Sequence, residues 1–129
     1  MNGKRNEIIA TVPASICHTY SEDDPVCPGK TIQNYLSGGV CNLVSGGFLY
    51  NVPNSDFAIQ NRGGCRTDIL VGDFTYGDAF DILPFSNTLI TFDMTGAQIK
   101  AVLEDAVNFF LDKVGVASCI SAFEIPLPF

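Results

Sequence analysis

Hydrophobic and polar residues follow several different periods along the chain, and each period predicts a different element. Residues 7–12 (EIIATV) are mostly apolar and β-branched, which is typical of a strand. The prolines at positions 13, 25 and 28 predict a long loop after it. From Thr31 to Phe48, apolar residues recur with roughly helical spacing, so we expect a helix that is interrupted by its two Gly-Gly pairs.

The middle of the chain predicts two strands with a short helix between them. Residues 56–60 (DFAIQ) are typical of a short buried strand. Thr75 suits a helix N-cap and Asp78 follows it by three residues, so we expect a helix over 75–82 that ends before Pro84. Residues 87–94 (NTLITFDM) are apolar at most positions, which predicts a strand covered on both faces.

The strongest pattern lies over residues 95–111. Residues 95–98 (TGAQ) match a capping box, and the apolar residues that follow recur at spacings of three and four. They predict an amphipathic helix that lies on a sheet. Residues 114–129 show no such period. We therefore expect one α/β domain of the α+β kind over residues 1–113, with a small mixed sheet and packed helices, and a tail over 114–129 that does not match it.

Composition excludes several classes of protein. The chain has 129 residues, of which 47% are hydrophobic and 16% charged, and this is typical of a globular protein with a core. The net charge of −7, with seven basic residues spread along the chain, argues against a nucleic-acid partner. No apolar run reaches the length of about 18 residues that a membrane span needs. The first residues do not form a signal peptide.

Neither the cysteines nor the GKT sequence predicts a binding site for a metal or a phosphate. Five cysteines occur without a C-x-x-C pair, and the chain has one histidine, so a structural zinc site is not expected. The spacing allows a disulfide between Cys17 and Cys27, and the odd number of cysteines leaves at least one thiol unpaired. The sequence GKT at 29–31 fails the phosphate-loop pattern, because Asp24 stands where glycine is required.

Residues 61–66 (NRGGCR) are the best candidate for a ligand-binding loop. They follow a predicted strand, and adjacent glycines permit positive φ and let backbone amides approach a ligand closely. Arginine supplies a planar fork that suits phosphate or carboxylate. The alternative is a tight turn with a surface arginine.

Several motifs in order resemble the C-terminal domain of the 5'-nucleotidase family, a group of metallophosphatases that includes UDP-sugar hydrolases. They are the N-x-G-G-x-R pattern at 61–66, then GDFT at 72–75, LPFSNT at 83–88 and TGAQIK at 95–100. The resemblance covers about 60 residues strongly, and residues 40–50 match a preceding helix of the family with less fidelity.

The resemblance implies a role for six residues in binding a nucleotide or a related phosphate ester. Arg66 would hold the phosphate or ribose, and Phe85 would stack on the base. Asn87 would form a hydrogen bond to the base. The pocket would be shaped by Asn61, Gly63 and Gly64. In the family, two divalent metals and the catalytic residues belong to a separate N-terminal metallophosphatase domain, so we expect neither a catalytic residue nor a metal ligand in this chain.

The chain also departs from the family pattern. The second base-stacking aromatic residue of the family lies in a segment that this sequence does not contain, and arginines expected before residue 41 are replaced, with Cys41-Asn42-Leu43 in place of Gly-Asn-Leu. We expect the nucleotide-binding portion of a hydrolase of nucleotide catabolism. A catalytically inactive nucleotide-binding module and a non-functional truncated fragment are the alternatives. Family members are commonly periplasmic, extracellular or at the cell surface, and the location of this chain stays open.

Overall fold

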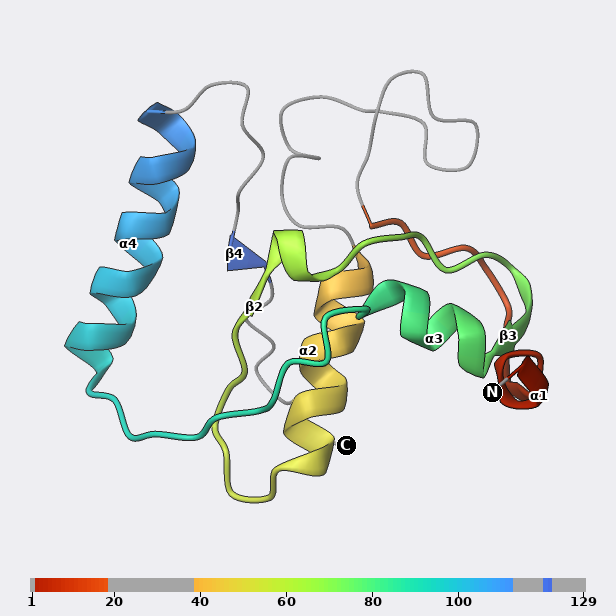
Figure 1. The fold of residues 1–129 in the computed structure, drawn as a ribbon. Coiled ribbons are helices and arrows are strands. Elements are labelled where there is room, and N and C mark those ends of the chain that lie inside the picture. Colours follow the sequence, from red (N-terminus) through yellow and green to blue (C-terminus); the bar gives the residue numbers. More distant parts are fainter. Residues whose placement is uncertain (1, 19–38, 113–119, 122–129) are drawn as a thin grey trace.

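The computed structural model describes residues 2–18, 39–112 and 120–121, and the fold is given for these residues (Figure 1). The elements in chain order are α1 (Asn2–Arg5), β1 (Ile8–Val12), α2 (Gly39–Asn51), β2 (Gln60–Asn61), the 3₁₀ helix η2 (Arg62–Gly64), β3 (Gly72–Thr75), α3 (Tyr76–Ile82), α4 (Gly96–Asp112) and β4 (Ile120–Ser121). The predicted α/β class is confirmed. The strands form two separate antiparallel pairs, β1 with β3 and β2 with β4.

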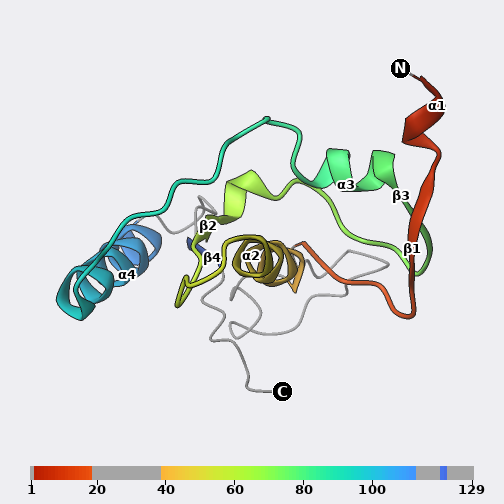
Figure 2. The same ribbon diagram turned by 90° about the horizontal axis from the view of Figure 1, so that it is seen from below.

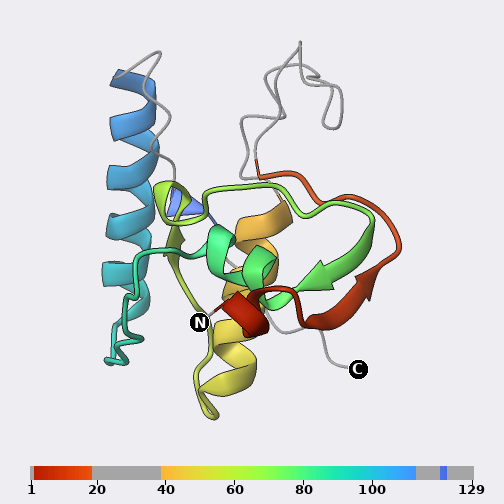
Figure 3. The same cartoon turned by 45° about the vertical axis from the view of Figure 1, so that its right-hand side comes forward.

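The first pair joins the beginning of the chain to its middle. Strand β1 runs antiparallel to β3, with Val12 opposite Gly72 and Ile8 opposite Thr75, and the register shifts between Ile8 and Ala10 (Figure 3). The predicted strand at 7–12 is therefore confirmed. The amide of Tyr76 donates to the carbonyl oxygen of Glu7 over 2.9 Å, so α3 begins directly beside the start of β1.

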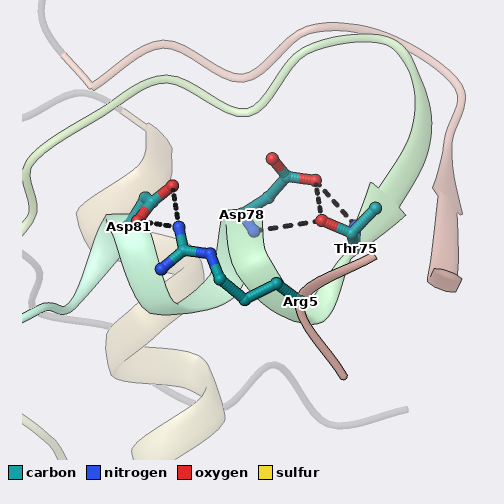
Figure 4. A network of polar contacts seen from close by, with 4 residues as sticks. All are labelled: Arg5, Thr75, Asp78 and Asp81. Carbon is teal, nitrogen blue, oxygen red and sulfur yellow. Dashed lines mark hydrogen bonds and ion pairs between the residues drawn. The ribbon is translucent and has the colours of Figure 1, made fainter. Parts of the chain in front are cut away.

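Helix α3 begins at a complete capping box. The amide of Asp78 donates to Oγ1 of Thr75 over 3.2 Å, and the amide of Thr75 donates to Oδ2 of Asp78 over 2.7 Å (Figure 4). Arg5 reaches the same helix and forms an ion pair with Asp81, in which the single nitrogen Nη2 lies 2.7 and 2.8 Å from the two carboxylate oxygens. The predicted helix, its cap and its end before Pro84 are confirmed.

A small core forms where α2 meets the chain before β3 and the end of α3. Its fully or almost fully buried members are Val40, Cys41, Cys65, Ile69 and Ile82. Figure 2 looks along α2 and shows the chain from β2 to α3 passing beside it. A backbone bridge between Ile16 and Ile69, with N···O distances of 2.8 and 2.9 Å, closes one side. The chain through Gly46 and Gly47 stays helical, so the expected interruption there is wrong; the rest of that prediction, residues 31–38, lies outside the described residues.

Two strand predictions are largely wrong for the same physical reason. Only Gln60 of the expected strand at 56–60 is in a strand, and residues 87–94 form an extended segment without strand pairing. In the second of these segments the apolar side chains of Leu89, Ile90 and Phe92 are exposed. A strand needs a neighbour to accept its backbone hydrogen bonds, and the described part of the chain places none beside residues 88–94.

Helix α4 lies apart from the core, next to the second strand pair (Figure 1). Its predicted capping box is confirmed, because the amide of Gln98 donates to Thr95 Oγ1 over 3.3 Å and the amide of Thr95 donates to Gln98 Oε1 over 2.8 Å. The sheet beside it consists of two residues from each strand, with Gln60 opposite Ser121 and Asn61 opposite Ile120. Strand β4 lies in the segment 114–129, where the sequence indicated no strand. None of the described helices combines the length and apolar character needed to cross a bilayer.

Candidate functional site

The loop 61–66 and the segment 83–87 lie side by side because the backbone joins them. The amide of Arg66 donates to the carbonyl oxygen of Ile82, the last residue of α3, over 3.0 Å. Cys65 and Ile82 are both buried in the core, which fixes the two chain segments on either side of this hydrogen bond. The sequence places Arg66 one residue after Cys65 and Phe85 three residues after Ile82, so both side chains emerge from the same edge of the core.

Arg66 and Phe85 are in direct contact at this edge. The guanidinium carbon of Arg66 lies 5.7 Å from the centre of the Phe85 ring, which is within the range of a cation–π interaction. Nη1 of Arg66 also donates to the carbonyl oxygen of Gly63 over 3.1 Å. Both side chains remain exposed, with 54% of Phe85 accessible to solvent. Phe85 and Arg66 therefore expose a ring face and a guanidinium group to solvent at the same place.

A second arginine on the same molecule shows what is particular to Arg66. Arg5 lies 5.6 Å from the centre of the Phe80 ring, a nearly identical arrangement. Its guanidinium is neutralised by the ion pair with Asp81. Arg66 has no carboxylate within ion-pair distance among the residues that the structure describes. Its positive charge is therefore available to an anion, whereas that of Arg5 is not.

The two glycines of the loop have different surroundings. Gly64 is buried, and a Cβ added to it would collide with the Gln60 side chain and come within 3.0 Å of Asn61 Oδ1. Gly63 is exposed, and an added Cβ would meet only Asn61 Nδ2 at 3.7 Å. Neither has a positive φ, since both lie in the turn of 3₁₀ helix. Close approach of the Gln60 and Asn61 side chains, rather than a left-handed backbone, distinguishes Gly64 from Gly63.

Gln60 is a residue of this site that the sequence analysis missed. Its amide nitrogen donates to the carbonyl oxygen of Asn61 over 3.2 Å and to Asn61 Oδ1 over 3.3 Å, and it covers the face of the loop above Gly64. It stands at the end of a predicted strand, where it gives no signal of its own in the sequence. The structure adds it to the residues that shape the loop.

A cleft of about 970 Å³ opens beside the loop. Gly64, Phe85 and Asn87 line it, together with the end of α2 and the extended residues up to 94. Asn61, Gly63 and Arg66 are not part of its wall. Ser86 has a φ of 53°, a left-handed conformation that turns the chain between Phe85 and Asn87. The volume suits a ligand of nucleotide size.

A metal site needs several suitable side chains gathered in one place. No group of three or more His, Cys, Asp or Glu side chains there could hold a metal ion. The described part of this chain therefore does not fit the two metals of the family. Cys17 is disulfide-bonded, and the expected partner, Cys27, lies outside the described residues. Cys41 and Cys65 are both thiols.

The comparison with protein families places this geometry in context. The family model described as "5'-nucleotidase, C-terminal domain" matches residues 22–121, which is most of the chain. The chain belongs to this family. The match runs past Lys113 and includes β4.

Three curated relatives carry related names. The chain is 52% identical to the probable 5'-nucleotidase of Treponema pallidum over 56 residues, 43% of this chain and 9% of that protein. It is 52% identical to the NAD 5'-nucleotidase of Haemophilus influenzae over 64 residues, 49% of this chain and 11% of that protein. It is 39% identical to a trifunctional nucleotide phosphoesterase of Bacillus subtilis over 70 residues, 52% of this chain and 5% of that protein. The chain matches about a tenth or less of each relative's length. No solved structure matches it.

Proposed function

We propose that this chain is the nucleotide-binding portion of a 5'-nucleotidase-type phosphoesterase of nucleotide catabolism. Membership of the family supports a nucleotide as the ligand. The observation that carries the proposal is the exposed contact between Arg66 and Phe85, at 5.7 Å, beside a cleft of about 970 Å³. An unneutralised guanidinium suits the phosphate, and the ring offers a face for the base.

The residues have distinct roles in this proposal. Phe85 stacks on the base, and Asn87, two residues on and in the same cleft, exchanges hydrogen bonds with the base edge. Arg66 binds the phosphate or the ribose. Asn61, Gly63 and Gly64 shape the loop. Gly64 has no side chain, so the Gln60 and Asn61 side chains can lie close to its backbone.

Phosphate ester hydrolysis itself is assigned to another part of the enzyme. Two divalent metals held by a separate N-terminal domain, as the family resemblance implies, would supply the Lewis acid for this chemistry. The described residues of this chain contain no group that fits such metals, so no step of hydrolysis is derived for them. With AMP and a divalent metal, the chain alone should release no phosphate above background.

The test is calorimetric titration of the chain with AMP. Arg66→Ala and Phe85→Ala should each weaken binding, because one removes the cation and the other removes the ring. Arg5→Ala and Phe80→Ala are matched controls, because they break a cation–π contact of nearly the same length, 5.6 against 5.7 Å, away from the loop 61–66. Equal affinities in wild type and all four variants, or binding lost equally in all four, would contradict the proposed site.

The catalytically inactive binding module differs from this proposal in one measurable respect. Both predict binding of AMP by this chain, but only a portion of a hydrolase restores turnover when the metal-binding domain of a relative is joined to it. Phosphate release by such a chimaera that depends on Arg66 and Phe85 favours the hydrolase. Absence of turnover, with binding intact, favours the inactive module.

A further inference from the structure

A pair of cysteines in the core has no part in the proposed function. Cys41, near the start of α2, and Cys65, in the loop 61–66, are both thiols and are both completely buried. They belong to one apolar cluster with Val40, Ile69 and Ile82. The two residues come from separate chain segments that the core brings together.

The two thiols interact directly. A hydrogen bond in which the Cys65 thiol donates to the Cys41 side chain, together with burial, raises the pKa of Cys65 above its ordinary value. A hydrogen bond between two thiols requires the sulfur atoms to be neighbours without an intervening side chain. A disulfide has a sulfur separation of about 2 Å and tolerates a limited range of Cβ directions. The bond can form once the two sulfur atoms approach to that separation.

An oxidised cysteine already lies at this edge of the core. Cys17 is disulfide-bonded and 8% exposed, and its carbonyl oxygen accepts a hydrogen bond from the amide of Val40 over 3.2 Å. Val40 immediately precedes Cys41. A setting that oxidises Cys17 also contains an oxidant for a neighbouring dithiol.

We propose that Cys41 and Cys65 form a disulfide that fastens helix α2 to the loop 61–66. The oxidant is a low-molecular-weight disulfide such as oxidised glutathione. The thiolate of one cysteine attacks this small disulfide, forms a mixed disulfide with one half of it and releases the other half as a thiol. The second cysteine then attacks the mixed disulfide and releases the remaining half as a thiol. The two protons of Cys41 and Cys65 end on the two released thiols, and one sulfur–sulfur bond replaces another. The proposal does not depend on nucleotide binding.

Burial determines the rate of this reaction. The thiolate is the attacking species, and a raised pKa together with complete burial makes it scarce in the closed core. Exchange therefore proceeds through local opening of the core, and the cross-link forms slowly in the folded chain. Once formed, the cross-link holds the loop 61–66 against α2. Burial of both sulfur atoms then slows their reduction.

Tryptic mapping can test the proposal directly. Cleavage after the lysines and arginines places Cys41 in peptide 31–62 and Cys65 in peptide 63–66, while Cys17 and Cys27 share peptide 6–30 and Cys119 lies in 114–129. The purified chain is first reduced and then incubated with oxidised glutathione. Remaining thiols are alkylated, and the chain is digested without reduction. We expect mass spectrometry to show peptide 31–62 joined to 63–66 with the loss of two hydrogen atoms, and this species to disappear with reductant.

Variants separate this cross-link from other disulfides. Cys65→Ala and Cys41→Ala should each abolish the joined peptide. Oxidation should raise the Tm of wild type by more than that of either variant, because the disulfide of Cys17 forms in all three chains. If a variant does not fold, the peptide map of the wild-type chain still shows whether Cys41 and Cys65 are joined. Peptides 31–62 and 63–66 that stay separately alkylated, while the disulfide of Cys17 forms, would overturn the proposal. So would peptide 63–66 joined predominantly to 6–30 or 114–129.

Discussion

The guanidinium of Arg66 lies 5.7 Å from the ring centre of Phe85, although a strand and a helix separate the two residues in the sequence. The hydrogen bond from the Arg66 amide to the Ile82 carbonyl oxygen, 3.0 Å long, accounts for this. It ties the end of the motif at 61–66 to the end of α3, which leads to the motif at 83–88. The contact thus depends on this backbone hydrogen bond and not on the two exposed side chains alone.

The roles of these two residues can be separated with a ligand that has no base. Phe85→Leu should weaken AMP binding by about 1 to 3 kcal/mol, the value of one stacked base, and leave ribose 5-phosphate binding unchanged. Arg66→Ala should weaken both ligands, because both carry the phosphate. Calorimetry with the two ligands measures this. Equal losses for AMP and ribose 5-phosphate in Phe85→Leu would show that the ring does not contact the base.

The two glycines of the loop should respond differently to alanine. In Gly64→Ala the new methyl group would collide with the Gln60 side chain and press on Asn61 Oδ1, so the hydrogen bond between these two residues should be lost. Gly63→Ala meets only an ordinary contact at 3.7 Å and serves as the control. We expect Gly64→Ala to weaken AMP binding about 10-fold, the effect of losing about 1.4 kcal/mol, and Gly63→Ala to change it little.

Amide chemical shifts in NMR spectra check the cause of that difference. Gly64→Ala should shift the side-chain amide resonances of Gln60 and Asn61 while the resonances of α4 stay unchanged. Unchanged Gln60 resonances with weakened binding would mean that the substitution acts through another route.

Local signals in the sequence predicted the capped elements well. Thr75 with Asp78 and Thr95 with Gln98 each form the expected capping box, because every group involved lies within four residues. The strand at 7–12 was also predicted, since its β-branched residues favour an extended chain wherever the partner comes from.

Features that depend on distant partners were predicted poorly. Residues 88–94 have a strong strand pattern, yet no strand lies beside them in the described structure and Phe92 is 71% exposed. Gln60 was missed because its importance comes from the space above Gly64, which no local pattern records. Conversely, a two-glycine interruption was expected in α2, but packing against the core keeps the helix continuous.

The two capping boxes should differ in acid. Hydrogen bonds from Thr75 lower the pKa of Asp78 below its model-compound value of 3.8. A lowered pKa in the folded state means that the stabilisation is complete above the unfolded value and is lost as pH falls through the folded one. Gln98, in the second box, does not titrate. The Asp78 box is therefore the acid-sensitive one.

Alanine at the two N-caps tests this difference. Thr75→Ala and Thr95→Ala should each lower the free energy of unfolding by about 1 kcal/mol at pH 7. As pH falls below 3.8, the cost of Thr75→Ala should shrink, while that of Thr95→Ala should stay constant. Urea denaturation across this pH range gives both values. A parallel decrease in the two variants would assign the effect to general acid destabilisation and not to Asp78.

The contact between α3 and the start of the chain leaves no room for a side chain at Gly77. This buried residue lies in the first turn of α3, where a Cβ would stand 2.9 Å from the backbone carbonyl oxygen of Arg5 and 3.4 Å from Thr75 Oγ1. A backbone atom cannot rotate away as the end of a side chain can. The clash should outweigh the better helix propensity of alanine, so Gly77→Ala should destabilise the fold by about 1 to 3 kcal/mol.

Gly96, the first residue of α4, is the matched control, because an added Cβ would have no atom within 4 Å. Gly96→Ala should leave the stability unchanged or raise it by up to about 1 kcal/mol. Urea denaturation of both variants tests the pair. If Gly77→Ala were as stable as Gly96→Ala, α1 and the start of β1 could not be held against α3 as the amide of Tyr76 and the carbonyl oxygen of Glu7 place them.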